Sequence, residues 1–310
     1  MPVKALFAAP ARLWEVYASA LPQAFAEAGL DVDLSRDHAP DEVDYIIFAP
    51  RGPLSDFTPY RRARAVLGLW AGVETVVGNP TLTQPLARMA DAGLRDGMVE
   101  WVTGHVLRYH LGIDAQLAAQ DGQWCPVSAP LARNRRVGIL GLGALGAACA
   151  GALKALNFDV AGWSRRPKAL PDIQTHSGTE GLHSILARSD ILVLLLPQTP
   201  ETENTLNTKT LAMMPRGARL LNPGRGPLID DDALLAALDS GQIGHATLDV
   251  FRIEPLPPGH PYWAHPNVTV TPHIASETRP DTAAAFIAEN IARYEQGAAL
   301  LNEVDRAAGY

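Results

Sequence analysis

The chain has 310 residues, of which 47% are hydrophobic and 19% charged, with a formal net charge of −7. This length suggests two globular domains, and the negative charge argues against nucleic-acid binding, which needs clustered lysine and arginine. The two cysteines, Cys125 and Cys149, form no CxxC pair and have no metal-ligand spacing, and no apolar run reaches transmembrane length. We therefore predict a cytoplasmic protein with no metal site and no membrane segment.

The first 98 residues have the pattern of one α/β unit. An apolar strand at residues 3–8 precedes a periodic helix at 12–28, which Gly29 ends. Further strands are expected at residues 32–34, 45–48, 65–70 and 75–77. Strands that alternate with helices predict a parallel, doubly wound sheet. A longer helix follows over 97–117, where apolar residues recur every three or four positions.

A glycine-rich stretch at residues 136–146, RVGILGLGALG, has the pattern of a buried strand, a tight turn and a helix. A second strand follows at residues 158–163 and completes a βαβ unit. Gly141 permits the turn, Gly143 lets the backbone approach a pyrophosphate, and Gly146 lets the helix pack closely on the strand. Because unpaired N–H groups at a helix N-terminus bind phosphate, the stretch predicts a dinucleotide-binding domain.

The alternation continues after residue 163. Strands are expected at residues 191–196, 218–221, 246–250 and 268–271, and helices at 181–188, 231–239 and 280–296. Ligands of doubly wound sheets lie at the carboxyl ends of the strands, and Arg225, Asp249, Glu254 and His273 each follow a predicted strand. A guanidinium, a carboxylate and an imidazole together can hold an anionic substrate and move a proton.

The end of the second strand of the βαβ unit indicates which dinucleotide is bound. NAD-binding domains place an acidic residue there, about 20 residues after the first glycine, to accept a hydrogen bond from the ribose. Here the chain has Trp163, Ser164, Arg165 and Arg166, with no carboxylate. Two guanidinium groups suit a 2′-phosphate, so we predict NADP(H) in preference to NAD(H), although a solvated basic turn would have the same composition.

Five blocks of sequence, in order, resemble the D-isomer-specific 2-hydroxyacid dehydrogenases, and among them the glyoxylate/hydroxypyruvate reductases. The blocks are GLGALG at 141–146, LLLPQTPET at 194–202, NPGRG at 222–226, LDVFRIEPLP at 248–257 and TPHI at 271–274. The resemblance runs from about residue 65 to the C-terminus, whereas the first 60 residues match only in their strand–helix pattern. Glu74 stands where many members of this family carry Asp.

The resemblance implies a fold of two doubly wound, Rossmann-like or flavodoxin-like domains with a cleft between them. Because a small substrate would have to touch both domains, we expect them to close on it about hinges near residues 98 and 275. Residues 1–98 and 276–310 would bind the substrate, and residues 99–275 the cofactor. It also implies that Arg225 binds the carboxylate of a small 2-keto acid and that His273 donates a proton to its carbonyl oxygen. Glu254 would pair with His273 and raise its pKa.

The resemblance further assigns residues to the substrate, the cofactor and a partner subunit. Substrate contacts would be Trp70, Ala71 and Gly72, together with Arg225 and His273. Cofactor contacts would be Gly141, Leu142, Gly143, Ala144, Leu145, Gly146, Trp163, Ser164, Arg165, Arg166, Leu196, Pro197, Thr202, Asn222, Pro223, Gly224, Asp249 and Ala275. Asp249 would orient the nicotinamide carboxamide. The region 98–117 builds a dimer in such proteins, so a homodimer is expected.

Two other functions remain open from the sequence. A D-2-hydroxyacid dehydrogenase that acts on a larger keto acid would carry the same blocks, because the pocket for the substrate side chain lies where the resemblance is weakest. A non-catalytic, NAD(P)H-responsive protein like the corepressors built on this fold would also retain the arginine, glutamate and histidine. Turnover of glyoxylate separates an enzyme from a corepressor.

Overall fold

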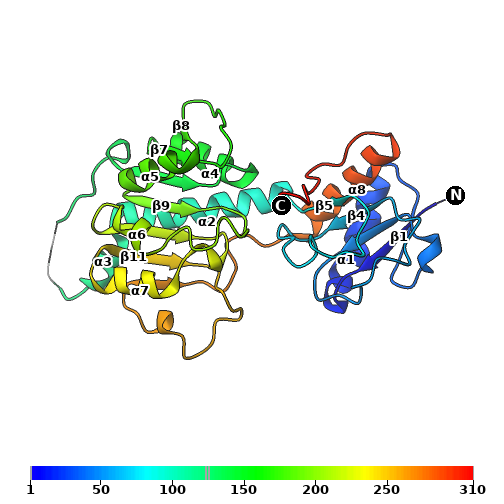
Figure 1. Ribbon diagram of the computed structural model, residues 1–310, viewed down its shortest axis with the longest axis horizontal. Helices are drawn as coiled ribbons and strands as arrows, with labels where there is room; N and C mark the ends of the chain where they lie inside the picture. The colour runs from blue at the N-terminus through cyan, green and yellow to red at the C-terminus, as the bar shows by residue number, and fades with distance from the viewer. Residues whose placement is uncertain (1, 123, 125, 310) are drawn as a thin grey trace. The chain divides into compact units, whose positions relative to one another are not determined.

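The computed structural model describes residues 2–122, 124 and 126–309, so Cys125 lies outside the described residues. The chain divides into two compact units (Figure 1). Unit 1 comprises Met1–Leu94 and Glu277–Tyr310, and unit 2 comprises Arg95–Ser276. The sequence prediction put the boundaries after residues 98 and 275, and the assignment of substrate to one part and cofactor to the other stays a prediction.

Unit 1 is built on a parallel sheet in the order β2-β1-β3-β4-β5, the order of flavodoxin-like folds. Its strands are β1 (Val3–Ala8), β2 (Val32–Ser35), β3 (Tyr45–Phe48), β4 (Ala65–Gly68) and β5 (Leu86–Ala87). Helices α1 (Ala11–Glu27) and α8 (Pro280–Glu295) pack side by side against one face of this sheet (Figure 1). The N-terminal and C-terminal parts of the chain thus share one apolar core.

The opposite face of the unit 1 sheet is covered by irregular segments. Phe57, Val76 and Leu82 come from these segments and pack on the strands. The strand expected at residues 75–77 is wrong, because this stretch forms a turn in which the amides of Val76 and Val77 both donate to the carbonyl of Val73. Val73 and Val76 are buried against the sheet rather than paired within it, and burial of this kind looks like a strand in the sequence.

Unit 2 is a seven-stranded parallel sheet in the order β12-β11-β10-β9-β6-β7-β8. Counted from β6, this is the strand order of dinucleotide-binding folds. The strands are β6 (Arg136–Leu140), β7 (Asp159–Trp163), β8 (Gln174–His176), β9 (Ile191–Leu194), β10 (Ala218–Asn222), β11 (Ile243–Leu248) and β12 (Val268–Val270). The prediction of two parallel α/β units is therefore confirmed.

Helices cover both faces of the unit 2 sheet. Helices α2 (Ala92–Leu111) and α4 (Ala144–Ala155) pack on one face, and the first three residues of α2 belong to unit 1. Helices α5 (Gly178–Arg188), α6 (Thr208–Ala212) and α7 (Asp231–Asp239) pack on the other. Short 3₁₀ turns η1 (Pro40–Glu42), η2 (Ala132–Asn134), η3 (Gly226–Leu228) and η4 (Pro261–Trp263) complete the two units.

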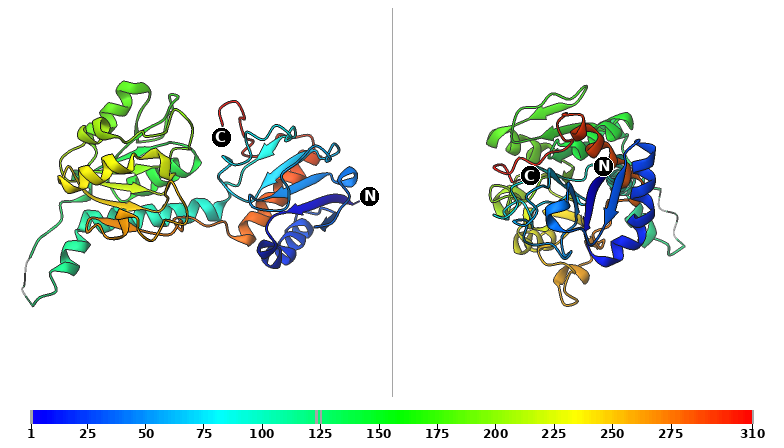
Figure 2. Two further views of the ribbon diagram at one scale, coloured as in Figure 1. Left: turned by 60° about the horizontal axis from the view of Figure 1, so that its bottom comes forward. Right: turned by 90° about the vertical axis from the view of Figure 1, so that its right-hand side faces the viewer.

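The helix predicted over residues 97–117 is two helices. Helix α2 ends at Leu111 and α3 (Ile113–Ala118) begins after Gly112, whose φ of +68° is a left-handed conformation that favours glycine and ends a helix. Helix α3 and the described residues of the loop between α3 and η2 extend away from the sheet of unit 2 (Figures 1 and 2). Across the described parts of the chain, no helix is both long and apolar enough to cross a membrane.

Candidate active site

The glycine turn joins β6 to α4, and three glycines lie in it or at the start of α4. Two of them lie too close to other backbone atoms for a side chain to fit, and the third faces open space. A Cβ atom on Gly141, whose φ is +106°, would lie 2.4 Å from the carbonyl oxygen of Leu195, and one on Gly146 would lie 1.8 Å from that of Gly141. A Cβ atom on Gly143 would meet nothing within 4 Å. Gly143 is the N-cap of α4 and makes no side-chain cap, so the open space lies where a phosphate can approach the helix N-terminus.

The turn after β7 presents two arginines beside the glycine turn. Arg165 and Arg166 are exposed, and Ser164 Oγ donates to the carbonyl of Arg166 at 2.7 Å. Lys168 Nζ donates to the carbonyl of Leu142, within the glycine turn, at 2.7 Å. The turn after β7 is thus hydrogen-bonded to the glycine turn. It carries positive charge and has no carboxylate between residues 163 and 168.

The predicted cofactor residues after β9 and β10 shape their own turns. Thr202 Oγ1 donates to the carbonyl of Pro197 at 2.7 Å and accepts from the amide of Thr199 at 2.8 Å. Asn222 is buried, and its side chain donates to the carbonyl of Arg225 at 2.9 Å and accepts from the amide of Gly224 at 3.1 Å. These contacts hold the segments that follow both strands in defined turns.

Glu254 and His273 form a hydrogen-bonded pair in the segments that follow β11 and β12. His273 Nδ1 lies 2.7 Å from Glu254 Oε2, while Glu254 Oε1 accepts from the amide of Phe251 at 2.9 Å. Arg225 follows the adjacent strand β10, and its Nη1 donates to the carbonyl of Gly224 at 2.7 Å. The structure therefore brings the predicted glutamate and histidine together and places the arginine at the same edge of the same sheet.

The charges in this group shift two pKa values in opposite directions. The hydrogen bond with Glu254, together with the charge of that carboxylate, raises the pKa of His273, although burial and the charge of Arg225 act in the opposite direction. Burial favours a higher pKa for Glu254, but hydrogen bonds from His273 and the Phe251 amide, with the charges of His273 and Arg225, bring it below its usual range. Asp249 adds a smaller contribution that raises the pKa of His273. The pair thus favours an imidazolium beside a carboxylate.

Asp249 anchors the loop that carries His273. Its buried carboxylate accepts from the Thr271 hydroxyl at 2.6 Å and from the amides of Ile274 and Ala275, each at 2.9 Å. Its carbonyl accepts from the amide of His273 at 2.8 Å. His273 has a φ of 57°, a left-handed conformation that is strained for a residue other than glycine. This anchoring role was missed in the sequence, and the predicted contact of Asp249 with nicotinamide stays a prediction.

The predicted substrate residues Trp70, Ala71 and Gly72 lie in unit 1, just after the carboxyl end of β4. The carbonyl of Trp70 accepts from the amide of Met89 at 3.1 Å, which ties this segment to the residues after β5. Glu74 is exposed in the turn that follows. Their role in substrate binding stays a prediction.

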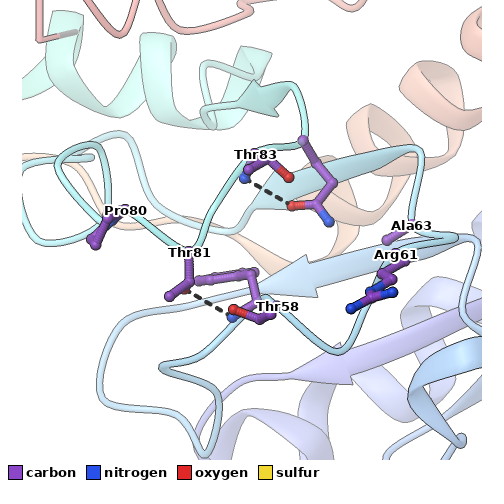
Figure 3. A pocket seen from close by; sticks show the side chains of 8 residues that line it. Thr58, Arg61, Ala63, Pro80, Thr81 and Thr83 are labelled. Atoms are coloured by element: carbon purple, nitrogen blue, oxygen red, sulfur yellow. Dashed lines mark hydrogen bonds between the residues drawn. The ribbon is translucent and has the colours of Figure 1, made fainter.

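A hollow of about 510 Å³ lies elsewhere in unit 1 (Figure 3). Its lining includes Phe57, Arg61, Thr81, Thr83 and Gln84, from segments that precede the amino ends of β4 and β5. Polar groups there bond one another, since the Thr83 amide donates to Gln84 Oε1 at 3.2 Å and the Phe57 amide donates to Thr81 Oγ1 at 3.0 Å. Because ligands of such sheets lie at the opposite edge, we do not assign this hollow to the active site.

Two further predictions concern a metal and a partner subunit. Among the described residues, no group of three or more histidine, cysteine, aspartate or glutamate side chains is arranged to hold a metal ion. Large apolar side chains are exposed in and after α3: Leu117 by 67%, Trp124 by 94%, Val127 by 79% and Leu131 by 60%. The homodimer stays a prediction, which an exposed apolar surface of this kind favours.

Comparison with known proteins shows both the fold and the family. Residues 105–275 match the family model of the D-isomer-specific 2-hydroxyacid dehydrogenase NAD-binding domain. A D-isomer-specific 2-hydroxyacid dehydrogenase from Xanthobacter autotrophicus Py2, solved with NADPH and MES, is 42% identical over all of both chains, with a TM-score of 0.93.

Two further solved structures carry NADP. An NADPH-dependent glyoxylate/hydroxypyruvate reductase from Sinorhizobium meliloti, solved with NADP and sulfate, is 34% identical over 100% of this chain and 99% of that chain, with a TM-score of 0.87. A probable 2-hydroxyacid dehydrogenase from Rhizobium etli CFN 42, solved with NADP, HEPES and L(+)-tartaric acid, is 31% identical over all of both chains, with a TM-score of 0.90.

The fold and the residues at the strand ends define an α/β oxidoreductase with a dinucleotide-type glycine turn. The chain belongs to the D-isomer-specific 2-hydroxyacid dehydrogenase family.

Proposed function

We propose that this protein reduces small 2-keto acids, such as glyoxylate and hydroxypyruvate, to 2-hydroxy acids with NADPH. The observation that carries the proposal is the 2.7 Å hydrogen bond between Glu254 and His273. This pair and Arg225 follow three adjacent strands, at the edge of the sheet where β6 leads into the glycine turn. Support for the substrate comes from the Sinorhizobium meliloti reductase, which is 34% identical.

In the proposed reaction, Arg225 binds the substrate carboxylate, because a planar guanidinium can donate two parallel hydrogen bonds to it. Bound NADPH would supply the hydride. His273, kept protonated by Glu254, donates its proton to the carbonyl oxygen as the negative charge develops there. Asp249 does not move a proton in this scheme and instead fixes the loop from which His273 acts.

The residues of the glycine turn fit a dinucleotide. Gly143 leaves open space at the N-terminus of α4, where the pyrophosphate would lie, and Arg165 and Arg166 would hold the 2′-phosphate. Structures with NADP or NADPH exist for relatives that are 31% to 42% identical. We infer that NADP(H) is preferred to NAD(H), because no carboxylate follows β7 to accept from a ribose hydroxyl.

Replacement of both arginines after β7 tests this preference. In Arg165→Ala/Arg166→Ala, kcat/KM for NADPH should fall at least about 10-fold, since a hydrogen bond to a charged group contributes about 1.5–3 kcal/mol. The value for NADH should change little and serves as the internal control. Initial rates at varied cofactor concentration give both numbers. An equal fall for the two cofactors would contradict the assignment of these arginines to the 2′-phosphate.

Removal of the carboxylate beside His273 should change the pH dependence of reduction. Because Glu254 raises the pKa of His273, the imidazolium persists to higher pH, and kcat/KM should decline only above its raised pKa. In Glu254→Gln this decline should begin at lower pH. Rate profiles of the two proteins test the shift, with Glu289→Gln, at an exposed position of α8, as the control. Identical profiles for wild type and Glu254→Gln would contradict the proposed pairing.

A panel of keto acids with NADPH and with NADH tests the proposed function as a whole. Highest kcat/KM with glyoxylate or hydroxypyruvate supports it. Preference for a longer keto acid would assign the protein to another substrate within the same family. Binding of NADPH without turnover of any 2-keto acid would instead favour a non-catalytic, NAD(P)H-responsive protein.

A further inference from the structure

Arg252 lies two residues before Glu254 and joins three segments of unit 2. Its guanidinium contacts the carbonyls of Ile229 at 2.7 Å and Pro227 at 3.4 Å, Glu203 Oε1 at 3.3 Å, Asp231 Oδ2 at 3.6 Å, and Asn204 Oδ1. Glu203 and Asn204 lie in the segment after β9, whereas the other partners lie in or just after η3, which begins directly after Arg225. One half-buried side chain therefore connects the segment that carries Glu254 with the turn that carries Arg225.

The same two segments are also in direct backbone contact. A Cβ atom on Gly226 would lie 2.0 Å from the carbonyl carbon of Phe251 and 2.4 Å from the amide nitrogen of Arg252. The peptide after Arg225 thus lies against the peptide before Arg252, with no room for a side chain between them. The amide of Asn204 donates to the carbonyl of Pro227 at 2.9 Å, so the segment after β9 is also bonded to η3. We call the contact of these three segments the junction.

We propose that Arg252 is a positioning residue, which holds the Arg225 turn and the Glu254 segment in the arrangement from which they act on one substrate. The inference rests on the proposed function of Arg225, Glu254 and His273. Arg252 acts through these side chains, since its own guanidinium is engaged with the carbonyls of Pro227 and Ile229. A displacement of about 1 Å between catalytic groups can cost about 100-fold in rate, so a loosened junction should slow the conversion of the keto acid.

The first test is the variant Arg252→Ala. Its kcat/KM for glyoxylate should fall by about 10- to 100-fold, and the decline of rate with rising pH should begin at lower pH, because His273 is no longer held at Glu254. Arg252→Lys should recover only part of this loss, since an ammonium has three donors where the guanidinium has five. Arg216→Ala is the matched control, since Arg216 is exposed to solvent. The one hydrogen bond described for its side chain is to the carbonyl of Ser240.

Chemical rescue separates positioning by the guanidinium from a general loss of packing. A hollow of about 360 Å³ borders the side chain, lined by Asn204, Asp230, Asp231, Asp232, Arg252 and His260. Guanidinium ion added below denaturing concentration can therefore reach the space left in Arg252→Ala. It should restore part of the rate, whereas potassium chloride at equal ionic strength should not. No rescue by guanidinium would overturn the claim that its hydrogen bonds position the site.

A measurement without turnover separates this inference from the proposed function. The pKa of His273, followed by NMR in wild type and Arg252→Ala, should be lower in the variant. An unchanged pKa together with unchanged kcat/KM would overturn the proposal. If wild type reduces no keto acid, the proposed function fails, and the NMR result alone decides whether Arg252 holds the Glu254–His273 pair. If Arg252→Ala does not fold, Glu203→Gln removes the charge of one partner of the guanidinium and should shift the pKa of His273 in the same direction by less.

Discussion

Replacement of His273 by alanine should lower the turnover number for glyoxylate by about 100- to 10,000-fold, the usual contribution of a general acid. The dissociation constant for NADPH should change much less, because the glycine turn and the arginines after β7 lie apart from the imidazole in the sheet order. Steady-state kinetics and fluorescence titration with NADPH measure the two quantities separately. The loss should be visible at every pH at which wild type is active.

A second histidine provides a matched control for this variant. His265 also faces a carboxylate, with Nε2 lying 3.3 Å from Asp239 Oδ1. In this pair Asp239 is the last residue of α7, His265 follows η4, and the side chain of Asp239 is 76% exposed. His265→Ala should retain turnover. Near-normal turnover in His273→Ala would show that another group donates the proton, and the assignment of His273 would be lost.

Exchange of Arg225 for lysine should not preserve function, although it preserves the charge. The KM for glyoxylate should rise by roughly 10- to 100-fold, because loss of one of two charge-assisted hydrogen bonds costs about 1.5–3 kcal/mol. Affinity for NADPH should be nearly unchanged. Initial rates over a range of glyoxylate concentration give the KM, and Arg61→Lys, an exposed position in the hollow of unit 1, is the control. A wild-type KM in Arg225→Lys would place the carboxylate contact elsewhere.

Elements with strong local patterns were predictable from the sequence. The helix expected at residues 12–28 is α1 (Ala11–Glu27), and the strand expected at 45–48 is β3. Two edge strands were not, because β5 has two residues and β8 (Gln174–His176) is polar and short, whereas the edge strands β2 and β12 were predicted. Strand β11 begins three residues earlier than expected, since Gly244 and His245 interrupt its apolar run while its backbone still pairs with β10. Pairing within a sheet depends on neighbouring strands, which a local pattern does not contain.

The candidate site shows the same limit. Residue types at strand ends were enough to select Arg225, Glu254 and His273, and the strand order explains why they lie at one edge. Their catalytic roles stay predictions. The contacts of Asp249 and Arg252 could not be derived, because their partners are mostly backbone groups whose directions depend on the folded loops. An aspartate that directly follows an apolar strand was the available signal for the first, and Arg252 offered none beyond its place in the block that contains Glu254.

The shared core of unit 1 has a consequence for how the protein is made. Helix α8 supplies Ala283, Ile287 and Ile291 to the core that α1 and the first sheet also line, yet it leaves the ribosome only after the whole of unit 2. At about 5–20 residues per second, the first sheet waits roughly 10 to 40 seconds for its second helix, with part of its apolar face uncovered. Unit 2 can fold during this interval. The segment that is synthesised first is therefore the part of the nascent chain most exposed to aggregation and chaperone binding. In most multidomain proteins, by contrast, the N-terminal domain folds first during translation.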